Sequence, residues 1–136
     1  LAPPEFSVER MAPLGDGVEL IVGARQDARF GPIAMVGLGG IYAETFEDVA
    51  IGLAPLDPQE AERLLRSLRG AALLGVVRGR PALDVAAAGR AAAALSLLAA
   101  ARPDIAEIEI NPLLATPDGA LALDARIIPK GDGDAG

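Results

Sequence analysis

The chain has 136 residues, a net charge of −7, and neither Cys nor His. This length holds one hydrophobic core and hence one domain. The acidity argues against a sequence-independent grip on nucleic acid or on an anionic membrane surface, and the missing residue types exclude disulfides, thiolate chemistry and a phosphohistidine in this chain.

The first half of the chain predicts a β-sheet. Short runs of aliphatic and β-branched residues alternate with turn signals such as Gly15-Asp16-Gly17. Because these runs lie too close together for crossover helices between them, they predict an antiparallel meander. The four expected strands cover residues 6–12, 18–24, 32–38 and 48–53.

Two helices are expected next. The first, 58–69, begins at Asp57-Pro58-Gln59-Glu60, where the Asp is an N-cap, the Pro is the first helical residue and the Glu completes a capping box. The second, 84–101, has apolar residues at every third or fourth position and stops before Pro103.

The last part of the chain returns to strand. Residues 105–110 form a β-type run that Pro112 is expected to end. Thr116-Pro117-Asp118-Gly119 has the residue types of a turn. The following run, 120–128, is the expected returning strand.

The pattern predicts an α+β domain over residues 1–129, a mainly antiparallel sheet with helices packed on one face, and a disordered tail over 130–136. The longest apolar stretch, 91–101, is much shorter than the about 20 residues of a membrane span. The first residues lack the basic end and apolar run of a signal peptide, so a cytoplasmic location is expected. Because the chain does not begin with Met, we expect it to be part of a longer polypeptide.

Side chains with oxygen ligands gather near the last predicted turn. Period-two geometry puts Glu107, Glu109 and Asn111 on one face of a strand, and the turn folds Asp124 back beside it. Such oxygens suit Mg²⁺, which one or two protein groups hold together with nucleotide phosphates. An edge hairpin whose polar face meets solvent explains the same pattern equally well. Spacing alone therefore leaves a metal site and a solvated hairpin open.

Several motifs in the right order resemble one protein family. The strings EIEINPL and LDARI resemble the closing motif of the ATP-grasp domain of ADP-forming acyl-CoA synthetases, and succinyl-CoA synthetase β-subunits carry a similar pattern. The segments GVELIVGARQDARFGPIAMVGLGGIYAE (17–44), LAPL (53–56) and LLGVVRGRPALD (73–84) are similar to the preceding core of that domain. The resemblance covers about residues 8–128 and implies the C-terminal subdomain of an ATP-grasp fold.

The resemblance also implies roles for single residues. Asn111 and Asp124 would hold the Mg²⁺ of a bound ATP, and Glu109 would be catalytic, beside the phosphoryl group in transit. The alternative for Glu109 is a structural strand residue that pairs with Arg126.

A second group of residues is implied to bind the nucleotide. Glu19 lies where the ATP-binding face of the family lies, although an exposed strand Glu explains it as well. Gly39 and Gly40 would allow a phosphate or a histidine-bearing loop to approach the backbone closely, and the alternative is a tight connection with positive φ. Arg78 and Arg80 either clamp a phosphate or lie in a solvated loop.

The implied function is the nucleotide- and Mg²⁺-binding half of an ADP-forming acyl-CoA synthetase, which converts an acid, CoA and ATP to acyl-CoA, ADP and phosphate through a phosphohistidine. The implied partners are an N-terminal ATP-grasp subdomain and a CoA-binding, phosphohistidine-bearing domain or subunit. Since the family's phosphate-binding lysines and its histidine are missing from this chain, we expect it to be inactive alone. The alternatives are a synthetase-like sensor region of a fused protein acetyltransferase, without turnover, and a stand-alone binding or scaffold domain.

Overall fold

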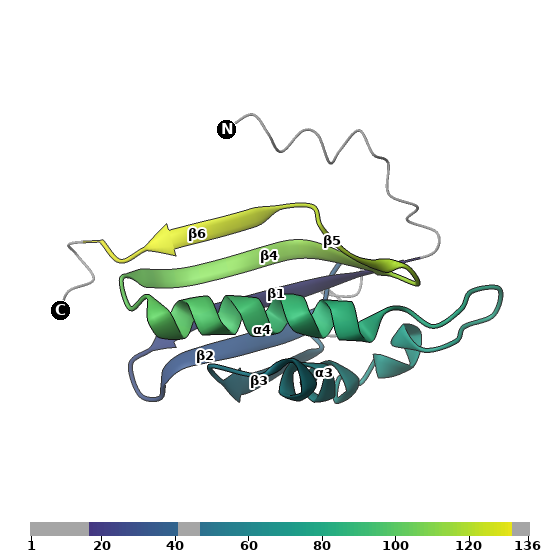
Figure 1. Ribbon diagram of the computed structural model, residues 1–136, viewed down its shortest axis with the longest axis horizontal. Coiled ribbons are helices and arrows are strands. Elements are labelled where there is room, and N and C mark those ends of the chain that lie inside the picture. Colours follow the sequence, from purple (N-terminus) through teal and green to yellow (C-terminus); the bar gives the residue numbers. More distant parts are fainter. Residues whose placement is uncertain (1–16, 41–46, 132–136) are drawn as a thin grey trace.

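The computed structural model describes residues 17–40 and 47–131. In this part the chain forms an antiparallel sheet with helices on one of its faces (Figure 1), which confirms the predicted α+β class. The elements are β1 (Val18–Asp27), β2 (Gly31–Leu38), β3 (Val49–Leu53), α3 (Pro58–Arg66), the short 3-10 helix η2 (Ala71–Leu74), α4 (Val85–Ala101), β4 (Ile105–Thr116), β5 (Gly119–Ala122) and β6 (Ala125–Pro129).

The sheet has the strand order β3-β2-β1-β4-β5, and β6 pairs with the other half of β4. All of its pairings are antiparallel. The long strand β4 therefore has β1 along one side, and β5 and β6 one after the other along its second side. The predicted meander over β1, β2 and β3 is confirmed.

Both predicted helices are present. The capping box that starts α3 is formed: Glu60 N donates to Asp57 Oδ1 at 2.7 Å, and Asp57 N donates to Glu60 Oε1 at 2.8 Å. This helix ends at Arg66, earlier than the expected residue 69. Helix α4 begins after Asp84, whose side chain accepts a hydrogen bond from the backbone of the first turn. None of the described helices is both long and apolar enough to cross a lipid bilayer.

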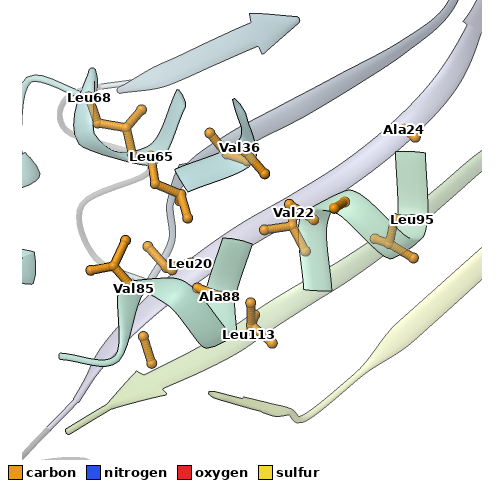
Figure 2. Packing of buried hydrophobic residues seen from close by; sticks show 14 of the residues in the cluster. Leu20, Val22, Ala24, Val36, Leu65, Leu68, Val85, Ala88, Leu95 and Leu113 are labelled. Atoms are coloured by element: carbon orange, nitrogen blue, oxygen red, sulfur yellow. The ribbon is translucent and has the colours of Figure 1, made fainter. Parts of the chain in front are cut away.

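The core lies between the helices and one face of the sheet. Leu20 and Val22 of β1 are fully buried and lie beside Ala88 and Leu95 of α4 (Figure 2). The two helices approach each other closely at Gly89, where a β-carbon would lie only 3.1 Å from the Pro58 carbonyl oxygen. Small residues in α4 thus allow α3 and the sheet to pack against it without large side chains between them.

The prediction that Pro112 ends the strand is wrong, because β4 continues to Thr116. The register between β1 and β4 shifts between Leu20 and Val22, so that Asn111 and Pro112 together lie opposite a single residue of β1. This is a β-bulge, one of the few places in a sheet where a Pro without its N–H is tolerated.

The prediction of one returning strand over 120–128 is also wrong, since β5 and β6 are separated by Leu123 and Asp124. The break lies beside the bulge: Asn111 N donates to the Asp124 carbonyl, and Leu123 N donates to the Pro112 carbonyl, both at 3.0 Å. An extra residue in β4 bends the sheet edge locally, and the neighbouring strand follows this bend by breaking in two.

Some predictions concern residues outside the described part of the chain. These are the strand over 6–12, the residues 41–44 after the two glycines, and the tail from residue 132 onward. Of the start of the tail, Lys130 is described, and its backbone N–H donates to the Asp104 carbonyl at 2.9 Å.

Candidate functional site

A polar pocket opens at the break between β5 and β6. It is lined by Glu109, Asn111, Asp124, Ala125 and Arg126, and its volume is about 160 Å³. A water molecule occupies about 30 Å³ in the liquid. The pocket therefore has room for a hydrated ion or for the oxygens of a larger ligand.

The bulge and the strand break together bring Asn111 and Asp124 to this pocket. The two residues are joined directly by a backbone hydrogen bond, Asn111 N to Asp124 O at 3.0 Å. Both residues are exposed to solvent. Their side chains line one pocket, which is the arrangement that a shared cation requires.

The donor set fits a hard divalent cation that also has ligands from outside the chain. The pocket offers two carboxylates, from Glu109 and Asp124, and the amide oxygen of Asn111. Mg²⁺ prefers such oxygens and is commonly held by one or two carboxylates plus substrate phosphates. Within the described ranges, no three Asp, Glu, His or Cys side chains converge as a complete metal cage. An ion held here would therefore complete its coordination with ligand oxygens and water.

Glu109 forms the cross-strand pair that was the alternative interpretation of this residue. It lies directly opposite Arg126 in the register of β4 and β6, and Arg126 Nη2 donates to Glu109 Oε1 at 3.2 Å. The Glu109 side chain is 20% exposed and that of Arg126 is 63% exposed. Both also line the pocket, so the ion pair and a role in the pocket do not exclude each other.

Glu19, Gly39 and Gly40 form a second cluster. Gly39 N donates to the Glu19 carbonyl at 2.8 Å. Gly40 has φ +61°, and a β-carbon there would lie 3.1 Å from Glu19 Oε1. These residues do not line the pocket of Glu109. The structure thus brings the three predicted nucleotide contacts together, and it shows the positive φ of the tight connection that was the alternative for the glycines.

Both clusters belong to the face of the sheet that points away from the helices. Leu20 and Val22 point toward α4, so Glu19 and Gly23 point to the opposite face, because side chains alternate along a strand. Glu109 lies opposite Gly23 in the register and shares its face. We call this surface the open face.

A shallow hollow on the open face, which the sequence patterns did not predict, adjoins the pocket at Glu109. It is lined by Gly23, Ala24, Arg25, Ile33, Met35, Glu107, Ile108 and Glu109. Gly23 has no side chain, and a β-carbon there would lie 3.7 Å from the Glu109 β-carbon. The glycine therefore leaves space beside the carboxylate. The alternation of residues 19–25 was the signal that could have placed Gly23 on this face.

Of the two loop arginines, Arg80 forms hydrogen bonds within its own loop. Its guanidinium donates to the carbonyl oxygens of Leu73, Gly75 and Pro81. Arg78 is exposed. Neither lines the pocket, so the structure favours the solvated-loop interpretation over a phosphate clamp.

The chain can be compared with known proteins. A family model described as an ATP-grasp domain matches residues 2–128. The beta subunit of acetate–CoA ligase [ADP-forming] I from Pyrococcus furiosus is 39% identical over 121 residues, which are 89% of this chain and 51% of that protein. The acetate–CoA ligase [ADP-forming] of Methanocaldococcus jannaschii is 35% identical over 115 residues, 83% of this chain and 16% of that protein.

A similar solved structure is the dinucleotide-forming acetyl-coenzyme A synthetase 1 of Candidatus Korarchaeum cryptofilum, determined with coenzyme A and Mg-AMPPCP and with a phosphohistidine segment pointing towards the nucleotide binding site. It has a TM-score of 0.79 and 39% sequence identity, over 84% of this chain and 54% of that one. The chain thus spans about half the length of the Pyrococcus and Korarchaeum relatives, and a smaller share of the Methanocaldococcus protein.

Proposed function

Since this chain belongs to the ATP-grasp domain family, we propose that it is the metal-binding half of the nucleotide site of an ADP-forming acyl-CoA synthetase. The complete enzyme converts a carboxylic acid, CoA and ATP to acyl-CoA, ADP and phosphate. The observation that carries this proposal is the pocket in which Asn111 and Asp124, joined by a backbone hydrogen bond, present their side chains beside Glu109. The names of the Pyrococcus and Methanocaldococcus relatives support the reaction class.

Asn111 and Asp124 would each supply an oxygen ligand to Mg²⁺, and the phosphates of ATP would supply others. When bound, the ion neutralises charge that develops on the phosphates during transfer. Glu109 stands beside the transferring group, where its carboxylate accepts a hydrogen bond from the histidine that receives the phosphoryl group. Glu19, Gly39 and Gly40 contact the nucleotide farther along the open face.

Residues 1–129 are, in this proposal, the C-terminal portion of an ATP-grasp domain, and the remaining half covers the open face. Two observations support this. The chain spans 51% of the Pyrococcus beta subunit. The side chains of Val49, Ile51 and Leu53 on β3 are 51–64% exposed in a row on the open face, and a row of exposed apolar side chains is typical of an interaction surface.

The phosphohistidine and the CoA site belong to a further domain or subunit. This chain contains no His, and the Korarchaeum protein has a phosphohistidine segment directed at its nucleotide site. The pocket keeps two carboxylates and an amide together, which favours phosphoryl transfer over a sensor region without turnover.

The test is the metal dependence of Asn111→Ala and Asp124→Ala in the complete enzyme. Each variant loses one metal ligand, so we expect the rate of acyl-CoA formation at fixed Mg²⁺ to fall by at least about tenfold. The affinity for Mn²⁺ in the presence of ADP, measured by electron paramagnetic resonance, should weaken by a similar factor. Asp118→Ala removes an exposed carboxylate from the β4–β5 turn and is the matched control. Unchanged metal dependence in both ligand variants would refute the proposed function.

A further inference from the structure

Arg126 forms an ion pair with one of the three oxygen-bearing side chains of the pocket. It extends from β6 directly opposite Glu109 on β4 and donates to that carboxylate at 3.2 Å. In contrast, within the part of the chain that the structure describes, Asp124 has no ion pair and the Asn111 side chain has no hydrogen bond. Of the three side chains in the pocket that could bind a metal through oxygen, Glu109 therefore has a guanidinium partner, and Asn111 and Asp124 do not.

This asymmetry matters because Glu109 is itself a good ligand for a divalent cation. It lines the same pocket as Asn111 and Asp124, and a carboxylate attracts a dication more strongly than an amide oxygen does. A carboxylate drawn onto the metal would no longer be free to face a group beside the metal. A charged guanidinium that hydrogen-bonds the carboxylate, and that repels the cation, opposes this movement.

We infer that Arg126 is a positioning residue that holds Glu109 out of the metal's coordination sphere, so that Asn111 and Asp124 bind the ion and Glu109 stays available to the transferring group. This inference rests on the proposed function of the pocket. Arg126 is suited to the task because its place opposite Glu109 is fixed by the strand register. The planar guanidinium keeps donors to spare after the one bond to Glu109.

The test measures metal affinity rather than turnover. In the complete protein with ADP bound, Mn²⁺ is the probe, and its dissociation constant is measured by electron paramagnetic resonance for Arg126→Gln, Glu109→Gln and the double variant. We expect Arg126→Gln to tighten Mn²⁺ binding, because Glu109 is released onto the metal. We expect Arg126→Gln to increase the Mn²⁺ affinity by a factor that is at least about fivefold larger in the protein with Glu109 than in the Glu109→Gln variant. A coupling of this size is found between residues of one ion-pair network.

Two controls separate this mechanism from a change of charge. Arg25→Gln removes a positive charge from the open face that forms no ion pair with Glu109 in the described part of the chain, and we expect less than about a twofold change. Arg126→Lys keeps a cation opposite the carboxylate and should stay near the wild-type affinity. Arg126 is 63% exposed, so its variants keep the fold, which thermal unfolding checks.

Each outcome decides one question. If Arg126→Gln tightens Mn²⁺ binding equally with and without the Glu109 carboxylate, Arg126 acts only through its charge, and this overturns the inference, as does an unchanged affinity of Arg126→Gln. If instead Asn111→Ala and Asp124→Ala bind Mn²⁺ as wild type does, the pocket is no metal site and the proposed function itself fails.

Discussion

The buried carboxylate of Asp48 offers a sharp test of what holds α3 against the sheet. Asp48 is only 3% exposed. Its two oxygens accept hydrogen bonds from Arg69 N at 2.8 Å and Gly70 N at 2.6 Å. It thereby ties the start of β3 to the turn that follows α3. Asp48→Ala removes both acceptors at once.

The magnitude follows from the two amides. Leaving a buried donor without a partner costs about 1–3 kcal/mol, and water that enters the space of the missing carboxylate recovers part of this. We therefore expect Asp48→Ala to lower the free energy of unfolding by about 3 kcal/mol, a large share of the roughly 5–15 kcal/mol that is typical of a domain. Asp48→Asn keeps one acceptor oxygen, so it should lose about half as much.

Urea unfolding, monitored by circular dichroism, measures the free energy of unfolding. An unchanged slope of this free energy against urea concentration indicates that the folded state is intact. Asp118→Ala, at an exposed turn position, should stay within about 0.5 kcal/mol. The reasoning is refuted if Asp48→Ala costs less than about 1 kcal/mol, or if Asp48→Asn is as stable as wild type.

Three further predictions test other parts of the chain. Ser96→Ala should cost about 1–3 kcal/mol in the same assay, because the Leu56 N–H loses the buried hydroxyl to which it donates at 2.8 Å, whereas exposed Leu97→Ala on the same helix should cost less than about 0.5 kcal/mol. The hydrogen bond from Arg102 lowers the pKa of Asp104 below 3.8, so its carboxyl titrates below that value in NMR and moves back toward it in Arg102→Gln. The associated stability is present above the unfolded-state pKa and is lost as pH falls through the lowered one. Calorimetric titration of this chain alone with Mg-ATP should show no binding tighter than about 1 μM, and submicromolar binding would contradict the assignment of half a site.

The helix starts could be predicted from the sequence because their signals are local. The capping box of Asp57 and Glu60 depends on residues three positions apart, and it is formed. The end of α3 could not be predicted in this way. The N–H groups of Arg69 and Gly70 are bound by Asp48, which is distant in sequence, and this tertiary contact replaces the last turn of the expected helix.

The pocket was predictable only in part. Period-two alternation put Glu107, Glu109 and Asn111 on one strand face, but it could not separate Glu107, which lines the neighbouring hollow, from the other two, which line the pocket. The bulge in β4 and the break before Ala125 arise from how three strands fit together, and no local pattern encodes them. The resemblance to a family, rather than spacing, singled out Asn111 and Asp124 as a pair, and their metal-binding role stays a prediction.

The bulge in β4 also reverses the phase of alternation along that strand. Just before it, the even-numbered Ile108 and Ile110 pack in or against the core, whereas after it the odd-numbered Leu113 and Ala115 do. Deleting one residue at 111–112 would restore a regular ladder with both halves of the strand still facing the core, but it would remove the bulge that lies beside the break between β5 and β6. The pocket therefore depends on an extra residue that the core itself does not require, so we expect homologous chains to keep the bulge at 111–112 while they accept insertions in the β4–β5 turn.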